Sequence, residues 1–184
     1  MSYMTQGAFV LDPDLEYCNY LILMGAQAGF MAEPYTTKTA GRMAKARSRG
    51  MKVVVVDPVI STAAAKADEW VPIRPGTDGA LALAMVNVLL NEVGIYDVEF
   101  LKKYTNGPYL INSEGYYLRD KTTNKPLIWD SGSETARTYD SPETKDLALE
   151  GNYQVNGTSA IPSFQLLKEH VSKYTCEEVS KITT

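Results

Sequence analysis

Three short segments of the sequence carry residue types that bind phosphorylated ligands. The candidates are Gly25 and Gln27, then Asp57 and Pro58, and finally Gly76, Thr77 and Asp78. Glycine lets a backbone approach a pyrophosphate closely, and an Asp that ends a strand can accept hydrogen bonds from ribose hydroxyls. Where a Gly turn leads into a helix, free N–H groups and the positive end of the helix dipole suit a phosphate. Together the segments predict a nucleotide-like ligand.

Each segment also has a purely structural interpretation. The first contains Gly25 and Gly29 but is not a complete G-x-G-x-x-G, so it fits a tight strand-to-helix turn equally well. Asp57 before Pro58 is a common way to stop a strand. Residues 71–78 would also serve as an ordinary capped connection into a helix, with Thr77 and Asp78 at the cap.

The elements that must position these segments form a strand-helix-strand pattern. Residues 20–24 and 52–56 are apolar runs without polar alternation, which is typical of buried parallel strands. Residues 35–49 between them favour a helix that Gly50 ends. Residues 69–73 predict a third strand. Because ligands bind at the carboxyl edge of open α/β sheets, the three segments are expected to meet there.

Helical patterns continue to residue 104. Residues 61–67 and 97–104 predict short helices, and residues 80–93 predict a longer one that Gly94 ends. The longer helix is apolar on nearly every side, so we expect it to pack between layers or against another domain.

The composition changes after residue 107 toward Tyr, Thr, Asn, Asp and Gly. We expect a hairpin of residues 115–120 and 126–130, and a second one around Asn156-Gly157 with a type I′ turn. A helix capped by Ser163 and a last one with a capping box over residues 175–178 close the chain.

The pattern as a whole predicts an α/β fold. We expect a three-layer, Rossmann-like parallel sheet with helices on both faces, followed by a β-hairpin-rich appendage and a C-terminal helix. The predicted domain division is a dinucleotide-binding core over residues 1–107 and a hairpin-rich insertion with closing helices over residues 108–184.

Several function classes find no support in the sequence. The net charge of −4 argues against a nucleic-acid surface, and neither a membrane-spanning run nor a signal peptide is visible. Cys18 and Cys176 have no metal-ligand spacing, and a disulfide between them has little to recommend it. The single histidine, His170, falls on a predicted surface helix. No catalytic or metal-ligating residues are therefore expected, and binding is the function that the residues support.

Five segments together resemble the molybdopterin oxidoreductases, the catalytic subunits of the dimethyl sulfoxide reductase superfamily, and most closely the polysulfide and thiosulfate reductase-like branch. They are residues 20–25, 53–58, 67–81, 164–168 and 174–177, and the second of them is the run that ends in Asp57-Pro58. The segment 67–81 is the most specific. The family commonly has Asn at the position of Gln27 and Arg at that of Val59.

The resemblance implies that this chain is an internal fragment of a larger protein. It would hold the guanine nucleotide half of one of two molybdopterin guanine dinucleotides, through Gly25, Gln27, Asp57, Gly76, Thr77 and Asp78. Molybdenum or tungsten and an iron–sulfur cluster would be bound by other segments of the parent enzyme, which would carry out two-electron oxo- or sulfur-transfer chemistry. The fragment alone is expected to be inactive.

The resemblance also implies partners. They are the remaining domains of the parent and an electron-transfer subunit, without nucleic acid or membrane insertion. An orphaned apolar face on residues 80–93 would favour self-association. Two alternatives remain open: a central domain of a thiamin-diphosphate enzyme, and a non-catalytic interaction module that has lost its ligand.

Overall fold

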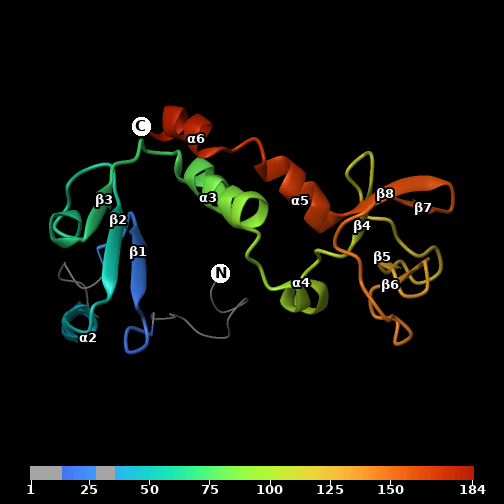
Figure 1. Ribbon diagram of the computed structural model, residues 1–184, viewed down its shortest axis with the longest axis horizontal. Coiled ribbons are helices and arrows are strands. Elements are labelled where there is room, and N and C mark those ends of the chain that lie inside the picture. Colours follow the sequence, from blue (N-terminus) through green and yellow to red (C-terminus); the bar gives the residue numbers. More distant parts are fainter. Residues whose placement is uncertain (1–13, 28–35) are drawn as a thin grey trace. The chain divides into compact units, whose positions relative to one another are not determined.

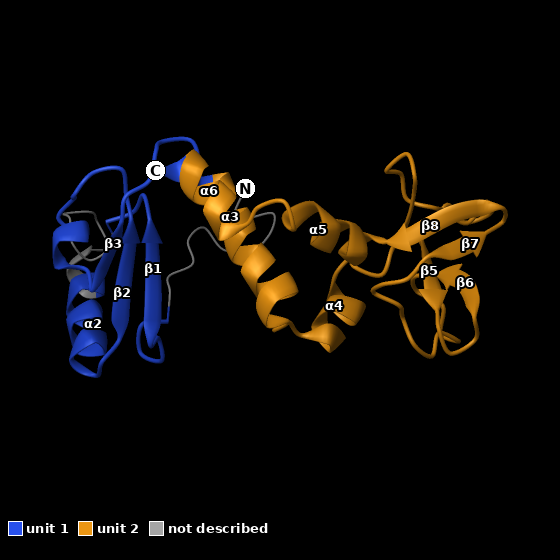
Figure 2. Ribbon diagram, turned by 45° about the horizontal axis from the view of Figure 1, so that its top comes forward, with its two compact units in different colours: residues 1–78, 183–184 blue, residues 79–182 orange. Residues whose placement is uncertain are grey.

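The computed structural model describes residues 14–27 and 36–184, and the chain divides into two compact units (Figure 2). Unit 1 comprises residues 1–78 and 183–184, and unit 2 comprises residues 79–182. The predicted division into a core that ends at residue 107 and an insertion that follows it stays a prediction. Each unit is described separately below.

Unit 1 contains the predicted parallel sheet. Its order is β1 (Tyr20–Met24), β2 (Lys52–Val56) and β3 (Glu69–Val71), and all pairings are parallel. Helix α2 (Thr36–Ser48) connects the first two strands, and the 3-10 helix η1 (Ala64–Lys66) precedes the third (Figure 1). The predicted strand-helix-strand unit is confirmed. Strand β3 ends two residues earlier than expected, where Pro72 removes a main-chain donor.

Helix α2 covers one face of this sheet. Its Met43 and Ala46 pack with Val53 and Val55 in a core of buried side chains. On the opposite face of β1, the side chains of Tyr20, Ile22 and Met24 remain 40–59% exposed. The α/β class is therefore confirmed, while the described part of unit 1 carries its helical layer on one face. A strand that is apolar on both faces fits a sheet that is covered on both sides when fully assembled.

The first helices of unit 2 follow the predicted pattern. Helix α3 (Asp78–Asn87) continues into the π-helical turn η2 (Val88–Val93), which ends at Gly94 with φ +69°. Helix α4 (Val98–Tyr104) is capped by Asp97, whose carboxylate accepts a 2.8 Å hydrogen bond from the Phe100 amide.

One stripe of the α3–η2 segment is exposed. Ala84 and Asn87 are buried, whereas Met85, Leu89 and Val93 are 38–54% exposed. These three lie four residues apart, so they line one side of the helical segment. The packing of this helix between layers or against another domain stays a prediction, and the described residues leave this stripe uncovered.

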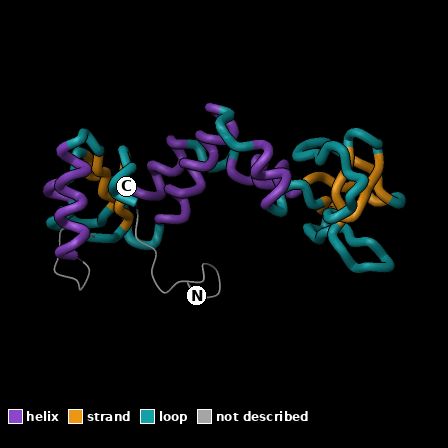
Figure 3. The backbone as a smooth tube through the Cα atoms, turned by 90° about the horizontal axis from the view of Figure 1, so that it is seen from below, coloured by secondary structure: helices purple, strands orange, loops and turns teal. Residues whose placement is uncertain are grey.

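Unit 2 also contains two antiparallel sheets (Figure 3). Strands β4 (Leu110–Asn112), β8 (Thr158–Pro162) and β7 (Tyr153–Val155) form one, and β5 (Leu127–Asp130) and β6 (Thr135–Thr138) form the other.

The structure confirms one of the two expected hairpins and contradicts most of the other. The Asn156-Gly157 turn is confirmed, because Val155 pairs with Thr158 and both turn residues have positive φ. The other hairpin is reduced to a single bridge between Arg119 and Pro126, because Ile128 on that edge of β5 bridges to Tyr109, while the opposite edge pairs with β6.

Helices α5 (Ser163–Val171) and α6 (Cys176–Thr183) complete the chain. Thr175 caps α6 as predicted, since its hydroxyl accepts a hydrogen bond from the Glu178 amide. The predicted cap at Ser163 is wrong, because Pro162 occupies the N-cap position. The Ser163 hydroxyl donates instead to the carbonyls of Asn106 and Gly107.

Candidate functional site at the strand tips of unit 1

The parallel register brings the ends of the three strands to one edge of the sheet. Met24 pairs with Val56, and Val56 pairs with Val71, so the residues that follow these three leave the sheet together. The Gly25 amide donates to the Val56 carbonyl at 2.9 Å, and the Asp57 amide donates to the Val71 carbonyl at 3.2 Å. The first two predicted segments therefore lie side by side at the carboxyl edge, where the third segment also begins.

Asp57 is held in place by its own loop. Its side chain is buried, and one carboxylate oxygen accepts a 3.2 Å hydrogen bond from the Val59 amide. Its carbonyl accepts a 2.9 Å hydrogen bond from the Trp70 indole. The second carboxylate oxygen, Oδ2, has no hydrogen-bond partner among the described residues. Asp57 thus presents one fixed, unused acceptor, and Pro58 beside it is exposed.

The two glycines of the site adopt backbone conformations that favour glycine. Gly25 has φ +58° and Gly76 has φ +83°, and open space surrounds both α-carbons where a side chain would stand. A side chain at either position would be strained.

Thr77 and Asp78 lead into helix α3. The Thr77 hydroxyl donates to the Arg74 carbonyl at 2.7 Å, so its oxygen keeps its acceptor capacity. Asp78 is the exposed first residue of α3, and no described residue pairs with its carboxylate. An acidic side chain in the first turn also stabilises the helix through the dipole.

An open cavity of about 340 Å³ lies at this edge of unit 1. Pro58, the chain from Pro72 to Pro75, and Thr183 and Thr184 line it. Arg74 is held there, because its amide donates to the Thr183 carbonyl and its guanidinium to the Thr184 carbonyl, both at 2.7 Å.

Of the predicted site residues, Pro58 lines this cavity directly. Gly25, Gln27 and Asp57 belong to the neighbouring strand tips, and Gly76, Thr77 and Asp78 follow the cavity wall along the chain. Gly29 lies outside the described residues.

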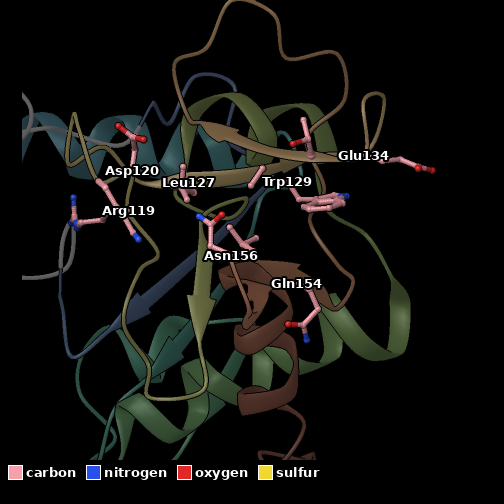
Figure 4. A pocket seen from close by; sticks show the side chains of 11 residues that line it. Arg119, Asp120, Leu127, Trp129, Glu134, Gln154 and Asn156 are labelled. Atoms are coloured by element: carbon pink, nitrogen blue, oxygen red, sulfur yellow. The ribbon is translucent and has the colours of Figure 1, made fainter.

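A larger cavity of about 390 Å³, in unit 2, was not anticipated from the sequence (Figure 4). It lies between hairpin β5–β6 and the β7–β8 hairpin. The cavity could have been predicted only from the pairing of β5 with β6. The sequence pattern instead favoured a pairing of residues 126–130 with residues 115–120.

Unit 2 also contains a buried carboxylate that the sequence did not single out. The Asp130 side chain is fully buried, with Oδ1 accepting hydrogen bonds from the amides of Gly132, Lys145 and Asp146 at 2.9–3.2 Å. Its Oδ2 accepts from the Ser133 hydroxyl at 2.6 Å and lies 3.3 Å from the Arg137 guanidinium. The Ser133 and backbone hydrogen bonds lower the pKa of Asp130 to about 2. This cluster is structural, since every donor belongs to the fold itself.

Other chemistry is sparse in the part of the chain that the structure describes. Cys18 and Cys176 are both free thiols, and no three His, Cys, Asp or Glu side chains there gather as they would around a metal ion. His170 lies exposed on α5 beside the Tyr174 ring, as predicted. None of the helices described is both long and apolar enough to span a bilayer.

Comparison with known proteins defines the class. The family model for molybdopterin oxidoreductases matches residues 2–128, which is more than half of the chain. The chain therefore belongs to the molybdopterin oxidoreductase family, a family of molybdenum-cofactor redox enzymes. This agrees with the resemblance drawn from the sequence and excludes the thiamin-diphosphate alternative.

Individual relatives show how much of such an enzyme the chain represents. A sulfite dehydrogenase subunit of Allochromatium vinosum is 35% identical over 93% of this chain and 19% of its own length. The alpha subunit of perchlorate reductase from Dechloromonas aromatica is 30% identical over 97% of this chain and 23% of its own length. Among solved structures, acetylene hydratase from Pelobacter acetylenicus matches with a TM-score of 0.52 and 25% identity, over 92% of this chain and 15% of that one. The chain thus spans about a fifth of these curated relatives.

Proposed function

We propose that this chain binds the guanine nucleotide part of a molybdopterin guanine dinucleotide, as one domain of a larger molybdenum or tungsten oxidoreductase. The observation that carries the proposal is the shared edge at which Gly25 and Asp57 leave adjacent parallel strands. Family membership supplies the cofactor class, and the strand tips supply the chemistry of a nucleotide site.

The donor and acceptor set fits such a ligand. The free Oδ2 of Asp57 would accept a hydrogen bond from a ribose hydroxyl. Gly25 and Gln27 would approach the pyrophosphate, with Pro58 bounding the site. The carboxylate of Asp78 would accept hydrogen bonds from the N1–H and amino group of guanine, which adenine does not offer in that pattern. Gly76 and Thr77 would place that carboxylate at the helix start.

The remaining chemistry of the parent enzyme would come from outside this chain. When bound, the cofactor supplies a metal centre that exchanges two electrons with a small substrate by oxo or sulfur transfer. The residues proposed here bind and orient the nucleotide end. The parent enzyme would also contain an iron–sulfur cluster, the protein ligand to the metal and the remaining domains of the catalytic polypeptide. A partner subunit would transfer electrons. The exposed stripe of Met85, Leu89 and Val93 would contact those domains, or favour self-association without them.

Asp78→Asn tests the guanine contact. We expect wild-type chain to bind GMP with a Kd on the order of 1 mM, because part of a site supplies only part of the contacts. It should bind AMP about tenfold more weakly, and Asp78→Asn should remove that preference. Asparagine preserves the helix start, so the fold should survive. Titration calorimetry with GMP, GDP and AMP measures the affinity of the wild type for each nucleotide and the preference that remains in Asp78→Asn.

Glu69→Gln is the matched control for this experiment. It removes the same charge at the first residue of β3, which pairs with Val54 in the middle of β2, and it should bind GMP like the wild type. Silent titrations at millimolar GMP and GDP would favour the alternative of an interaction module that has lost its ligand. Equal binding of GMP and AMP would contradict the role of Asp78.

A further inference from the structure

The indole of Trp70 joins the apolar core of unit 1 to the loop that carries Asp57. Trp70 is the middle residue of β3 and pairs with Val55 of the central strand. Its ring packs against the core cluster that contains Val53 and Val55. From there its Nε1–H donates a 2.9 Å hydrogen bond to the Asp57 carbonyl. Trp70 is not among the residues proposed to contact the nucleotide, so its effect on a ligand would be transmitted by Asp57.

Asp57 is hydrogen-bonded to β3 on both sides of its α-carbon. Its amide donates to the Val71 carbonyl at 3.2 Å, and its carbonyl accepts from Trp70. The residue is 7% exposed, and the Val59 amide donates to Oδ1. Because Oδ2 has no hydrogen-bond partner among the described residues, the backbone of Asp57 and the turn to Val59 set the direction in which this oxygen points.

The hydrogen bond from Trp70 fixes a part of this loop that packing leaves unsupported. Val59 and Ile60 are each 65% exposed, so the chain after Asp57 is not held by the core. The Asp57 carbonyl belongs to the peptide plane that leads to Pro58 and Val59, and Trp70 holds that plane. Without the indole donor the plane can rotate and the Val59 amide can move away from Oδ1. The main-chain bond to Val71 would remain, so the strand itself would not be lost.

We propose that Trp70 is a positioning residue that makes the site select ribonucleotides over nucleotides without ribose hydroxyls. It acts through Asp57, whose Oδ2 would accept a hydrogen bond from the sugar, and the inference therefore rests on the proposed nucleotide function. A charged acceptor discriminates well when it is held in place before the ligand arrives, because a mobile acceptor must be ordered at the expense of binding free energy. Trp70 supplies that order from the core of the sheet.

Titrations with GMP and with 2′,3′-dideoxyguanosine monophosphate, which lacks both ribose hydroxyls, measure this preference by NMR. The wild-type chain should bind the dideoxy nucleotide about tenfold more weakly than GMP. Trp70→Phe keeps an aromatic ring against the core but has no N–H, and its preference for GMP should fall to about threefold or less. Trp129→Phe is the matched control, because it makes the same change at the other tryptophan of the chain, in unit 2, and should keep the wild-type preference.

Two further measurements separate positioning from a loss of stability. Destabilising unit 1 would lower the folded fraction, which weakens the binding of both nucleotides by the same factor and leaves their ratio unchanged. Asp57→Ala should remove the preference, and adding Trp70→Phe to that variant should change the ratio no further. Without nucleotide, amide hydrogen exchange at Val59 should become several-fold faster in Trp70→Phe. Exchange at Gly25, whose amide donates to the Val56 carbonyl, should stay as in the wild type.

Three results would overturn the role of Trp70. They are an unchanged nucleotide preference in Trp70→Phe, an effect of Trp70→Phe on the ratio that persists in Asp57→Ala, and exchange at Val59 that stays at the wild-type rate. A wild-type chain that binds neither nucleotide would instead contradict the proposed nucleotide function. The exchange rates at Val59 would still show in that case whether Trp70 holds the Asp57 loop, so the two failures can be told apart.

Discussion

Replacing Asp130 with alanine is expected to lower the melting temperature of unit 2 by on the order of 10 °C. The substitution leaves the amides of Gly132, Lys145 and Asp146 without their acceptor in a fully buried site. It also leaves the Arg137 guanidinium facing a cavity, although Arg137 keeps a second partner in Glu143. Thermal unfolding followed by circular dichroism measures the change.

The same carboxylate predicts how stability depends on pH. Because the folded pKa of Asp130 is about 2 and its ordinary value is 3.8, its ionised form stabilises the folded state. That contribution is fully present above the ordinary value and is lost as the pH falls toward 2. Asp130→Asn should therefore show a shallower loss of stability between pH 4 and pH 2 than the wild type. Parallel slopes for the two proteins would contradict this assignment.

Replacing Val55 with aspartate is expected to unfold the sheet of unit 1. Val55 is fully buried in the central strand, where an unpaired carboxylate costs several kcal/mol and has no described partner to offset it. The NMR signals of β1, β2 and β3 should lose their dispersion, and GMP binding should disappear with them.

Ile22→Asp is the matched control for Val55→Asp. It introduces the same side chain into the adjacent strand β1, but on the face where Ile22 is 41% exposed. Unit 1 of this variant should remain folded. If the two variants behave alike, the assignment of a buried and an exposed face to this sheet is wrong.

Local sequence patterns determined much of unit 1. The runs 20–24 and 52–56 could hardly form anything but strands, because they are short, apolar and bounded by turn residues. In unit 2, the Asn156-Gly157 turn could be predicted in the same way, since these residue types tolerate positive φ at both positions. Family membership also followed from the sequence, because its segments are specific in their order and composition.

Tertiary structure decided features that depend on contacts between distant residues. The main partner of β5 is β6 rather than residues 115–120, and Asp130 at the end of β5 accepts hydrogen bonds from residues 132, 133, 145 and 146. No local pattern marks such a carboxylate, so neither the cluster nor the neighbouring cavity was foreseen. The exposed face of β1 could not be predicted either. An apolar run indicates that a strand prefers burial, but it does not indicate which element covers the strand. The sequence thus determined which segments become strands and helices, through preferences that act over a few residues. The tertiary structure alone decided which polar groups meet, since that depends on pairings that only the folded chain brings together.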